Sequence, residues 1–213
     1  MRRPERRWQG RLSLRQRLWS TLTVPSVAFW DIAREPDRAG AFLILLGNVF
    51  SISLFYLLII LKVTGATSLI YGFLAVFPIS TLFLIIYNLV FYGIIHMIIR
   101  LSGRKASFGD TFILGQYSAL PLLLANLLSL GVLFVLLPAV SASELSRLVY
   151  PYQPIWLVVL VLTSIASLWG AVLLTLGIRE RYHMSTSSAL LTTFTVTIIV
   201  VLLGVFARLV PIT

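Results

Sequence analysis

The amino-acid sequence predicts an all-α integral membrane protein: a bundle of five transmembrane helices preceded by an N-terminal interfacial amphipathic helix. Of its 213 residues, 59% are hydrophobic and only 11% are charged, whereas about a quarter of the residues in an average soluble domain are charged. Five apolar runs are long enough to cross a bilayer. Basic residues also gather in alternate connections between these runs, as expected when a chain crosses a membrane repeatedly.

Residues 1–38 are predicted to be a basic cytoplasmic segment at the membrane surface. Nine arginines precede the first apolar run. A helical face within residues 1–22 favours a helix in the headgroup region, with Trp at the interface; it comprises Leu12, Arg15, Leu18, Trp19 and Leu22. A disordered basic tail is the alternative for these residues.

A second surface helix is predicted to begin at Thr23-Val24-Pro25-Ser26, because proline is favoured in the first turn. Its apolar surface would contain Phe29, Trp30 and Ile32, while Asp31, Arg34 and Glu35 stay polar. Pro36 would end it and lead the chain into the first span.

The predicted membrane domain covers residues 39–213, with spans at about 41–61, 78–99, 110–137, 155–178 and 187–209. The run before the second span is too long for one upright helix, so Leu69–Phe77 is re-entrant, interfacial or part of that span. In the third span, Pro121 predicts a bend, and the nearby glycines predict close helix packing.

Orientation follows from the distribution of the 17 basic residues. Fourteen fall on the side of the N-terminus and three on the other. The positive-inside rule therefore places the N-terminus in the cytoplasm and the C-terminus outside or in a lumen. In a prokaryote the membrane would be the plasma membrane. Basic residues clustered beside spans indicate anionic lipids, not nucleic acid, as the partner.

Five basic residues in the cytoplasmic loops are candidate contacts for anionic lipid headgroups, although they could serve only to set the topology: Arg100, Arg104, Lys105, Arg179 and Arg181. A second candidate site is a polar cluster within the spans, formed by Asn88, Tyr92, His96, Gln116, Tyr117, Pro121 and Asn126. These polar groups could form interhelical hydrogen bonds, each of about 1 kcal/mol. They could instead line a cavity in a small transporter or channel subunit.

Catalysis is not indicated by the sequence. Its seven carboxylates all lie outside the predicted spans or at their edges, and cysteine is absent. The chain lacks the motifs of metalloproteases, nucleophile elbows and phosphate-binding loops. We therefore expect no metal or cofactor, and a membrane enzyme centred on His96 is the remaining catalytic alternative.

The third span and the loop before it carry a family resemblance. The loop Gly103-Arg104-Lys105-Ala106-Ser107-Phe108 and the later Tyr117-Ser118-Ala119-Leu120-Pro121, with His96 upstream, resemble the Yip domain family of Ypt/Rab-interacting proteins. Looser matches extend over about residues 23–210, and include Pro25, Phe29, Trp30, Ile32, Trp169, Leu176-Gly177-Ile178 and Ser185–Ala189.

This resemblance implies five spans, a cytoplasmic N-terminus and a non-enzymatic role in membrane organisation or trafficking. Eukaryotic members bind prenylated small GTPases, whereas most prokaryotic members lack an assigned activity. The predicted first span begins at residue 41, so the segment before it is shorter than in the eukaryotic members. A membrane-protein partner or a second copy of the chain is also an expected contact.

Overall fold

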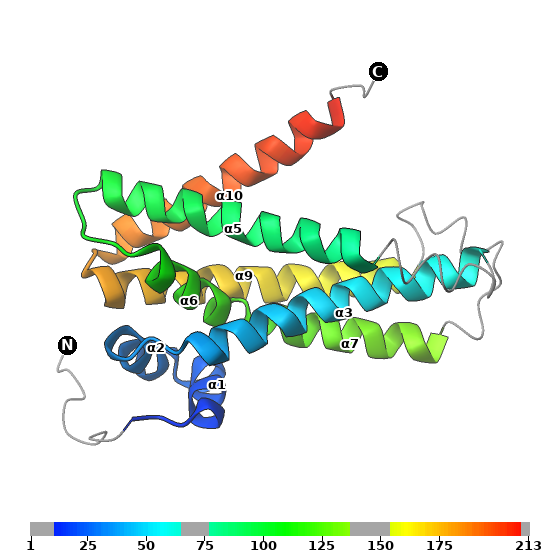
Figure 1. Cartoon of the computed structure of the whole chain (residues 1–213), viewed down its shortest axis with the longest axis horizontal. Helices are drawn as coiled ribbons and strands as arrows, with labels where there is room; N and C mark the ends of the chain where they lie inside the picture. The colour runs from blue at the N-terminus through cyan, green and yellow to red at the C-terminus, as the bar shows by residue number, and fades with distance from the viewer. Residues whose placement is uncertain (1–10, 65–76, 137–153, 210–213) are drawn as a thin grey trace.

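A computed structural model of the chain describes residues 11–64, 77–136 and 154–209, and these residues form helices joined by short connections, without a strand (Figure 1). The helices are α1 (Leu14–Thr23), α2 (Pro25–Arg34), α3 (Arg38–Thr64), α5 (Phe77–Leu101), α6 (Phe108–Ser118), α7 (Leu120–Leu136), α9 (Pro154–Tyr182) and α10 (Thr186–Leu209).

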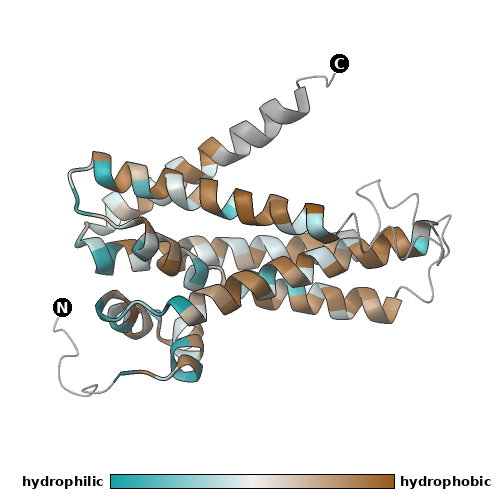
Figure 2. Cartoon of the chain, viewed as in Figure 1, coloured by the Kyte–Doolittle hydropathy of each residue, from teal (hydrophilic) through white to brown (hydrophobic). Residues whose placement is uncertain are grey.

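Three of these helices, α3, α5 and α9, are long and apolar enough to cross a membrane, and α6 with α7 forms a fourth candidate span that is bent. The part of α10 from Thr186 to Ile199 is a shorter apolar helix. The chain is therefore an all-helical integral membrane protein. Figure 2 shows apolar residues along the bundle and hydrophilic ones concentrated at the end where α1 and α2 lie.

The candidate span formed by α6 and α7 bends by 43° between these two helices. Pro121 causes this break, because it has no N–H and its ring would clash with the carbonyl of Tyr117 in a continuous helix. Ala119 occupies the break and its N–H bonds to the carbonyls of Gly115 and Gln116, both at 3.0 Å. The structure thus has the bend that Pro121 predicts.

The N-terminal segment folds into two short helices. Ser13 begins α1 with a capping box in which its hydroxyl accepts from the Gln16 N–H, and Pro25 stands in the first turn of α2. Figure 1 shows α2 nearly end-on, so it runs across the long direction of the bundle. Helix α2 packs on α9 and α1 packs on α2. We call these two helices the N-terminal hairpin.

The structure corrects one predicted position in this hairpin, that of Asp31 in α2. Arg17 and Thr21 are the buried residues of α1, whereas the Trp19 side chain is 68% exposed. Asp31, expected on the polar face of α2, is also buried. The apolar pattern misassigned Asp31, because Arg17 neutralises its charge inside the protein.

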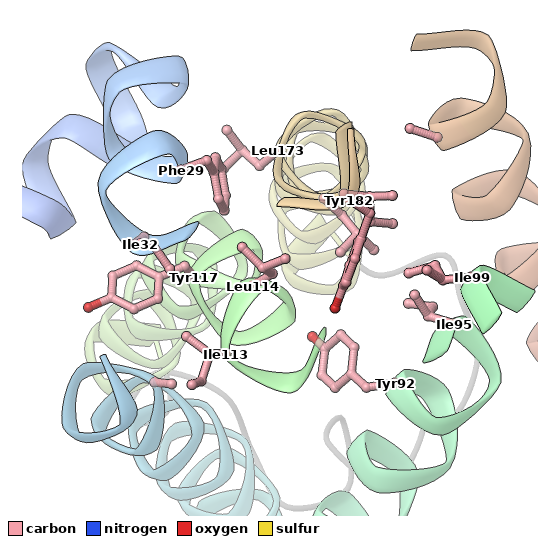
Figure 3. Close-up of a cluster of buried hydrophobic side chains, with 14 of the residues drawn as sticks. Phe29, Ile32, Tyr92, Ile95, Ile99, Ile113, Leu114, Tyr117, Leu173 and Tyr182 are labelled. Atoms are coloured by element: carbon pink, nitrogen blue, oxygen red, sulfur yellow. The ribbon is translucent and has the colours of Figure 1, made fainter. Parts of the chain in front are cut away.

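A cluster of buried apolar side chains joins the hairpin to the spans at this end of the bundle. Phe29 and Ile32 of α2 meet Leu114 of α6 and Leu173 of α9 in this core (Figure 3). The fit is close, since a Cβ added to Gly177 would lie 3.0 Å from the Phe29 ring. Residues 65–76, which include most of Leu69–Phe77, lie outside the described residues; Phe77 itself begins α5.

Candidate functional site at the basic end of the bundle

A buried ion cluster fastens the hairpin to the spans. The Arg17 side chain is 1% exposed, and its Nε donates to Asp31 Oδ2 at 2.6 Å. Its Nη1 lies 3.5 Å from Asp37 Oδ2, whereas Nη2 is buried without a hydrogen-bond partner. One arginine of α1 therefore binds a carboxylate of α2 and another just before α3.

Asp37 extends the connection to α6. The Tyr117 hydroxyl donates to Asp37 Oδ2 at 2.7 Å, and the Gly40 N–H donates to Oδ1 at 2.9 Å. Figure 3 shows the Tyr117 oxygen pointing away from the apolar cluster. Burial alone would raise the pKa of Asp37, but these donors and the nearby Arg17 guanidinium together lower it. Asp37 is thus held as a carboxylate.

Sequence reasoning missed this cluster, although it placed Tyr117 among candidate polar residues. Arg17 and Asp31 are separated by 14 residues, and Asp37 and Tyr117 by 80. Only the tertiary fold brings them together. The one local signal is Asp37-Arg38-Ala39-Gly40, where an Asp three residues before a glycine can cap the start of a helix.

Two of the five predicted lipid-binding residues, Arg179 and Arg181, already form ion pairs within the protein. Arg181 Nη2 donates to Asp110 Oδ2 at 2.6 Å, and its Nη1 bonds to the Ala33 carbonyl at the end of α2. Arg179 bonds to Glu180, with Nη2 to Oε1 at 2.7 Å. These contacts use Arg181 to join α9, α6 and the hairpin, so its charge is already compensated.

The other three predicted lipid-binding residues line a cleft of about 590 Å³ between the end of α5 and the start of α6. The cleft is bounded by Arg100, Gly103, Arg104, Lys105, Ala106, Ser107 and Asp110. All three basic side chains are exposed. We call this feature the basic cleft.

The predicted intramembrane polar residues separate into different contacts. Gln116 Nε2 donates to Asn88 Oδ1 at 3.1 Å, which joins α6 to α5. Asn126 Nδ2 donates to Asn48 Oδ1 at 3.1 Å, which joins α7 to α3. Each pair joins two helices through an amide hydrogen bond, although Gln116 Oε1 is buried without a partner. Such pairing is how amides contribute to helix association in lipid.

The other members of that predicted set are placed individually. Tyr92 packs its ring against Gly115, and Pro121 is buried at the bend. His96 lies edge-on to Phe108, with ring centroids 6.0 Å apart, and its Nδ1 is buried without a partner. Within the described residues no three histidine, aspartate or glutamate side chains gather as metal ligands.

Replacing Asn126 with Leu is expected to lower the free energy of unfolding by about 1 kcal/mol, the usual size of an interhelical hydrogen bond in a membrane protein. Asn48 would lose its interhelical donor while keeping its bond to the Ile44 carbonyl. Denaturant titration in mixed micelles measures the change. The exposed neighbour Leu127→Met is the control and should leave the unfolding curve unchanged. An unfolding curve equally unchanged by Asn126→Leu would contradict this role.

The fold and these contacts define a multi-pass helical membrane protein in which a polar N-terminal hairpin is built into one end of the bundle. Comparison with protein families identifies the family of this chain. The family model of the Yip1 domain matches residues 19–208. The chain belongs to the Yip1 domain family, which is not known for enzymatic activity. No curated protein and no solved structure matches it.

Proposed function

We propose that this protein is a non-enzymatic membrane organiser that gathers anionic lipids around its basic end. In this proposal the chain crosses the membrane five times, with the N-terminus in the cytoplasm. The fifth span would be α10, whose bounds, Thr186–Leu209, match the last predicted span. The α5–α6 and α9–α10 connections lie at the end of the bundle where the hairpin packs (Figure 1), consistent with one basic face.

The observation that carries the proposal is the outer surface of the hairpin. Trp19, Val24 and Trp30 are 68%, 49% and 38% exposed on a segment that runs across the bundle. The same segment carries four exposed arginines, of which Arg11 pairs with Glu35: Arg11, Arg15, Arg34 and Arg38. Tryptophan with arginine is typical of helices in the headgroup region. Here the Arg34 guanidinium also lies 3.6 Å above the Trp30 ring.

The buried ion cluster supports the same function, because it holds the hairpin against the spans. A surface helix joined by a loose linker could leave the membrane, whereas these contacts tie the hairpin to α3 and α6. The basic cleft lies at the same end and adds three cations. Each cation near an anionic surface contributes about 1 kcal/mol.

The amide contacts favour packing over a transport path. Asn88 and Asn126, which the transporter alternative needs in a polar cavity, each bond to an amide of a neighbouring helix. A small GTPase partner follows from family membership, and no contact described above identifies its binding surface. A role in trafficking is likewise proposed from the family alone.

The proposal predicts that anionic lipids are enriched around the protein. The wild-type protein is reconstituted in vesicles of mixed phosphatidylglycerol and phosphatidylcholine, extracted in polymer nanodiscs, and its lipids are quantified. We expect about twofold enrichment of phosphatidylglycerol over the bulk, diminishing at high salt because surface charges are screened.

A variant with six basic residues replaced by glutamine should return the lipid composition to that of the bulk. The replaced residues are Arg15, Arg34, Arg38, Arg100, Arg104 and Lys105. Lys62→Gln, in the last turn of α3 at the opposite end of that span, is the control and should leave the enrichment intact. A bulk composition around the wild-type protein would overturn the proposed function.

A further inference from the structure

The basic cleft has the chemistry of a specific anion site in addition to its share of the general surface charge. We propose that it binds a phosphomonoester group, such as the headgroup of a phosphatidic acid. The inference rests on the proposed function in that its ligand is an anionic group at this end of the bundle. It adds a defined place and a defined chemical class.

The cations of the cleft are available to a ligand. Within the part of the chain that the structure describes, Arg100, Arg104 and Lys105 form no ion pair. Asp110 also lines the cleft, but Arg181 compensates its charge, because Arg181 Nη2 lies 2.6 Å from Asp110 Oδ2. The cleft therefore presents about three uncompensated positive charges.

The start of α6 adds hydrogen-bond donors to the same place. Ser107 is the N-cap residue and lines the cleft, yet its side chain makes no capping bond. The N-cap side chain therefore leaves the first-turn amides of this 11-residue helix without a capping bond, and Asp110 is the acidic residue of that turn. Free amides and the positive end of a helix dipole both favour an anion, and here they reinforce three cations that bound a cleft.

The charge of the cleft selects between two kinds of phosphate. A phosphodiester carries one negative charge, whereas a phosphomonoester carries about −1.5 to −2 at pH 7 and offers three acceptor oxygens. Three facing cations are better compensated by the second. Leu101 and Phe108 follow the cleft residues Arg100 and Ser107 in the sequence, and they are 81% and 38% exposed. Acyl chains can contact such side chains, which favours a lipid over a soluble phosphate.

The test compares phosphatidic acid with phosphatidylglycerol at equal mole fraction in nanodiscs, with retained lipid read by native mass spectrometry. We expect the wild-type protein to retain phosphatidic acid at least about fivefold better, the value of roughly one additional charge contact. The preference should fall below about pH 6, where the phosphomonoester takes up a proton. A parallel arm offers glycerol 3-phosphate to protein in phosphatidylcholine nanodiscs and measures its binding.

Two triple variants with the same change in charge separate the site from the surface. Glutamine at Arg100, Arg104 and Lys105 should abolish the preference, and glutamine at Arg15, Arg34 and Arg38 should preserve it. Should the first variant fail to fold, single changes at the exposed loop residues Arg104 and Lys105 should reduce the preference in steps.

Each outcome has one meaning. Cleft-dependent binding of glycerol 3-phosphate would show that the phosphate group suffices, and retention of phosphatidic acid alone would show that the lipid is required; either supports the site. An equal preference in both triple variants, or no preference in the wild-type protein, would overturn the site. In both of these cases a general enrichment of anionic lipid would leave the proposed function standing, whereas absence of that enrichment would overturn the function itself.

Discussion

Replacing Arg17 with Met should lower the free energy of unfolding by about 3–5 kcal/mol, the usual cost of removing one partner from a buried ion pair. The change would leave Asp31 and Asp37 without their counter-charge, and their side chains are only 11% and 14% exposed. Denaturant titration in mixed micelles, followed by circular dichroism, measures the loss.

Arg15→Met is the matched control for this prediction, because Arg15 lies on the same helix and is exposed. It should change the stability by less than about 0.5 kcal/mol. Adding Asp31→Asn and Asp37→Asn to Arg17→Met should recover part of the loss, since the buried charges are then removed together. Equal unfolding curves for Arg17→Met and Arg15→Met would contradict a stabilising ion cluster.

Acid should release the hairpin through Asp37. Its pKa is lowered in the folded protein, so its stabilising contribution is complete above the unfolded value of about 3.9 and is lost as pH falls through the folded value. Asp37→Asn should therefore flatten the dependence of stability on pH below about 4. Unfolding midpoints measured across this range for both proteins test the effect, and parallel curves would refute it.

Gly115→Ala is expected to destabilise the bundle by about 3 kcal/mol, at the upper end of the usual cost of overpacking. An added Cβ would overlap the ring carbons of buried Tyr92, and that ring is confined by Phe91 and Phe112 at centroid distances of 5.2 and 5.8 Å. The contact between α5 and α6 would have to open. Thermal unfolding in detergent measures the change.

Gly131→Ala is the control for this effect, because a Cβ at Gly131 meets nothing within 4 Å. A glycine-to-alanine change at an open helical position is neutral or stabilising. In the double variant Gly115→Ala with Tyr92→Leu, the shorter side chain should restore part of the stability that Gly115→Ala loses. If Gly115→Ala unfolded at the same temperature as Gly131→Ala, the close packing of α5 on α6 would be wrong.

The sequence predicted the fold wherever one dominant signal acted locally. Long apolar runs located α3, α5, α9 and the bent pair, since lipid admits few polar residues. Pro25 and Pro121 marked a helix start and a bend because proline restricts its own backbone. The count of five spans stays a prediction, as does the division at residue 38.

The candidate site was less predictable, because its contacts are tertiary. A charged residue in an amphipathic segment is normally assigned to water, so Asp31 was placed on a polar surface and Arg17 was not singled out. Their pairing depends on how α1 crosses α2, which no local pattern encodes. The polar stripes of the spans indicated which side chains meet other helices. They did not indicate that Gln116 meets Asn88 while the adjacent Tyr117 meets Asp37.

The central claim is that the N-terminal hairpin lies in the membrane interface, and the depth of Trp19 tests it most directly. A variant keeping Trp19 alone, with phenylalanine at the other four tryptophans of the sequence, is reconstituted with lipids brominated either near the carbonyl or near the end of the acyl chain. If the hairpin lies in the interface, Trp19 is quenched strongly by the shallow bromines and weakly by the deep ones. Fluorescence unaffected by either lipid would place the hairpin in water and contradict an interfacial position.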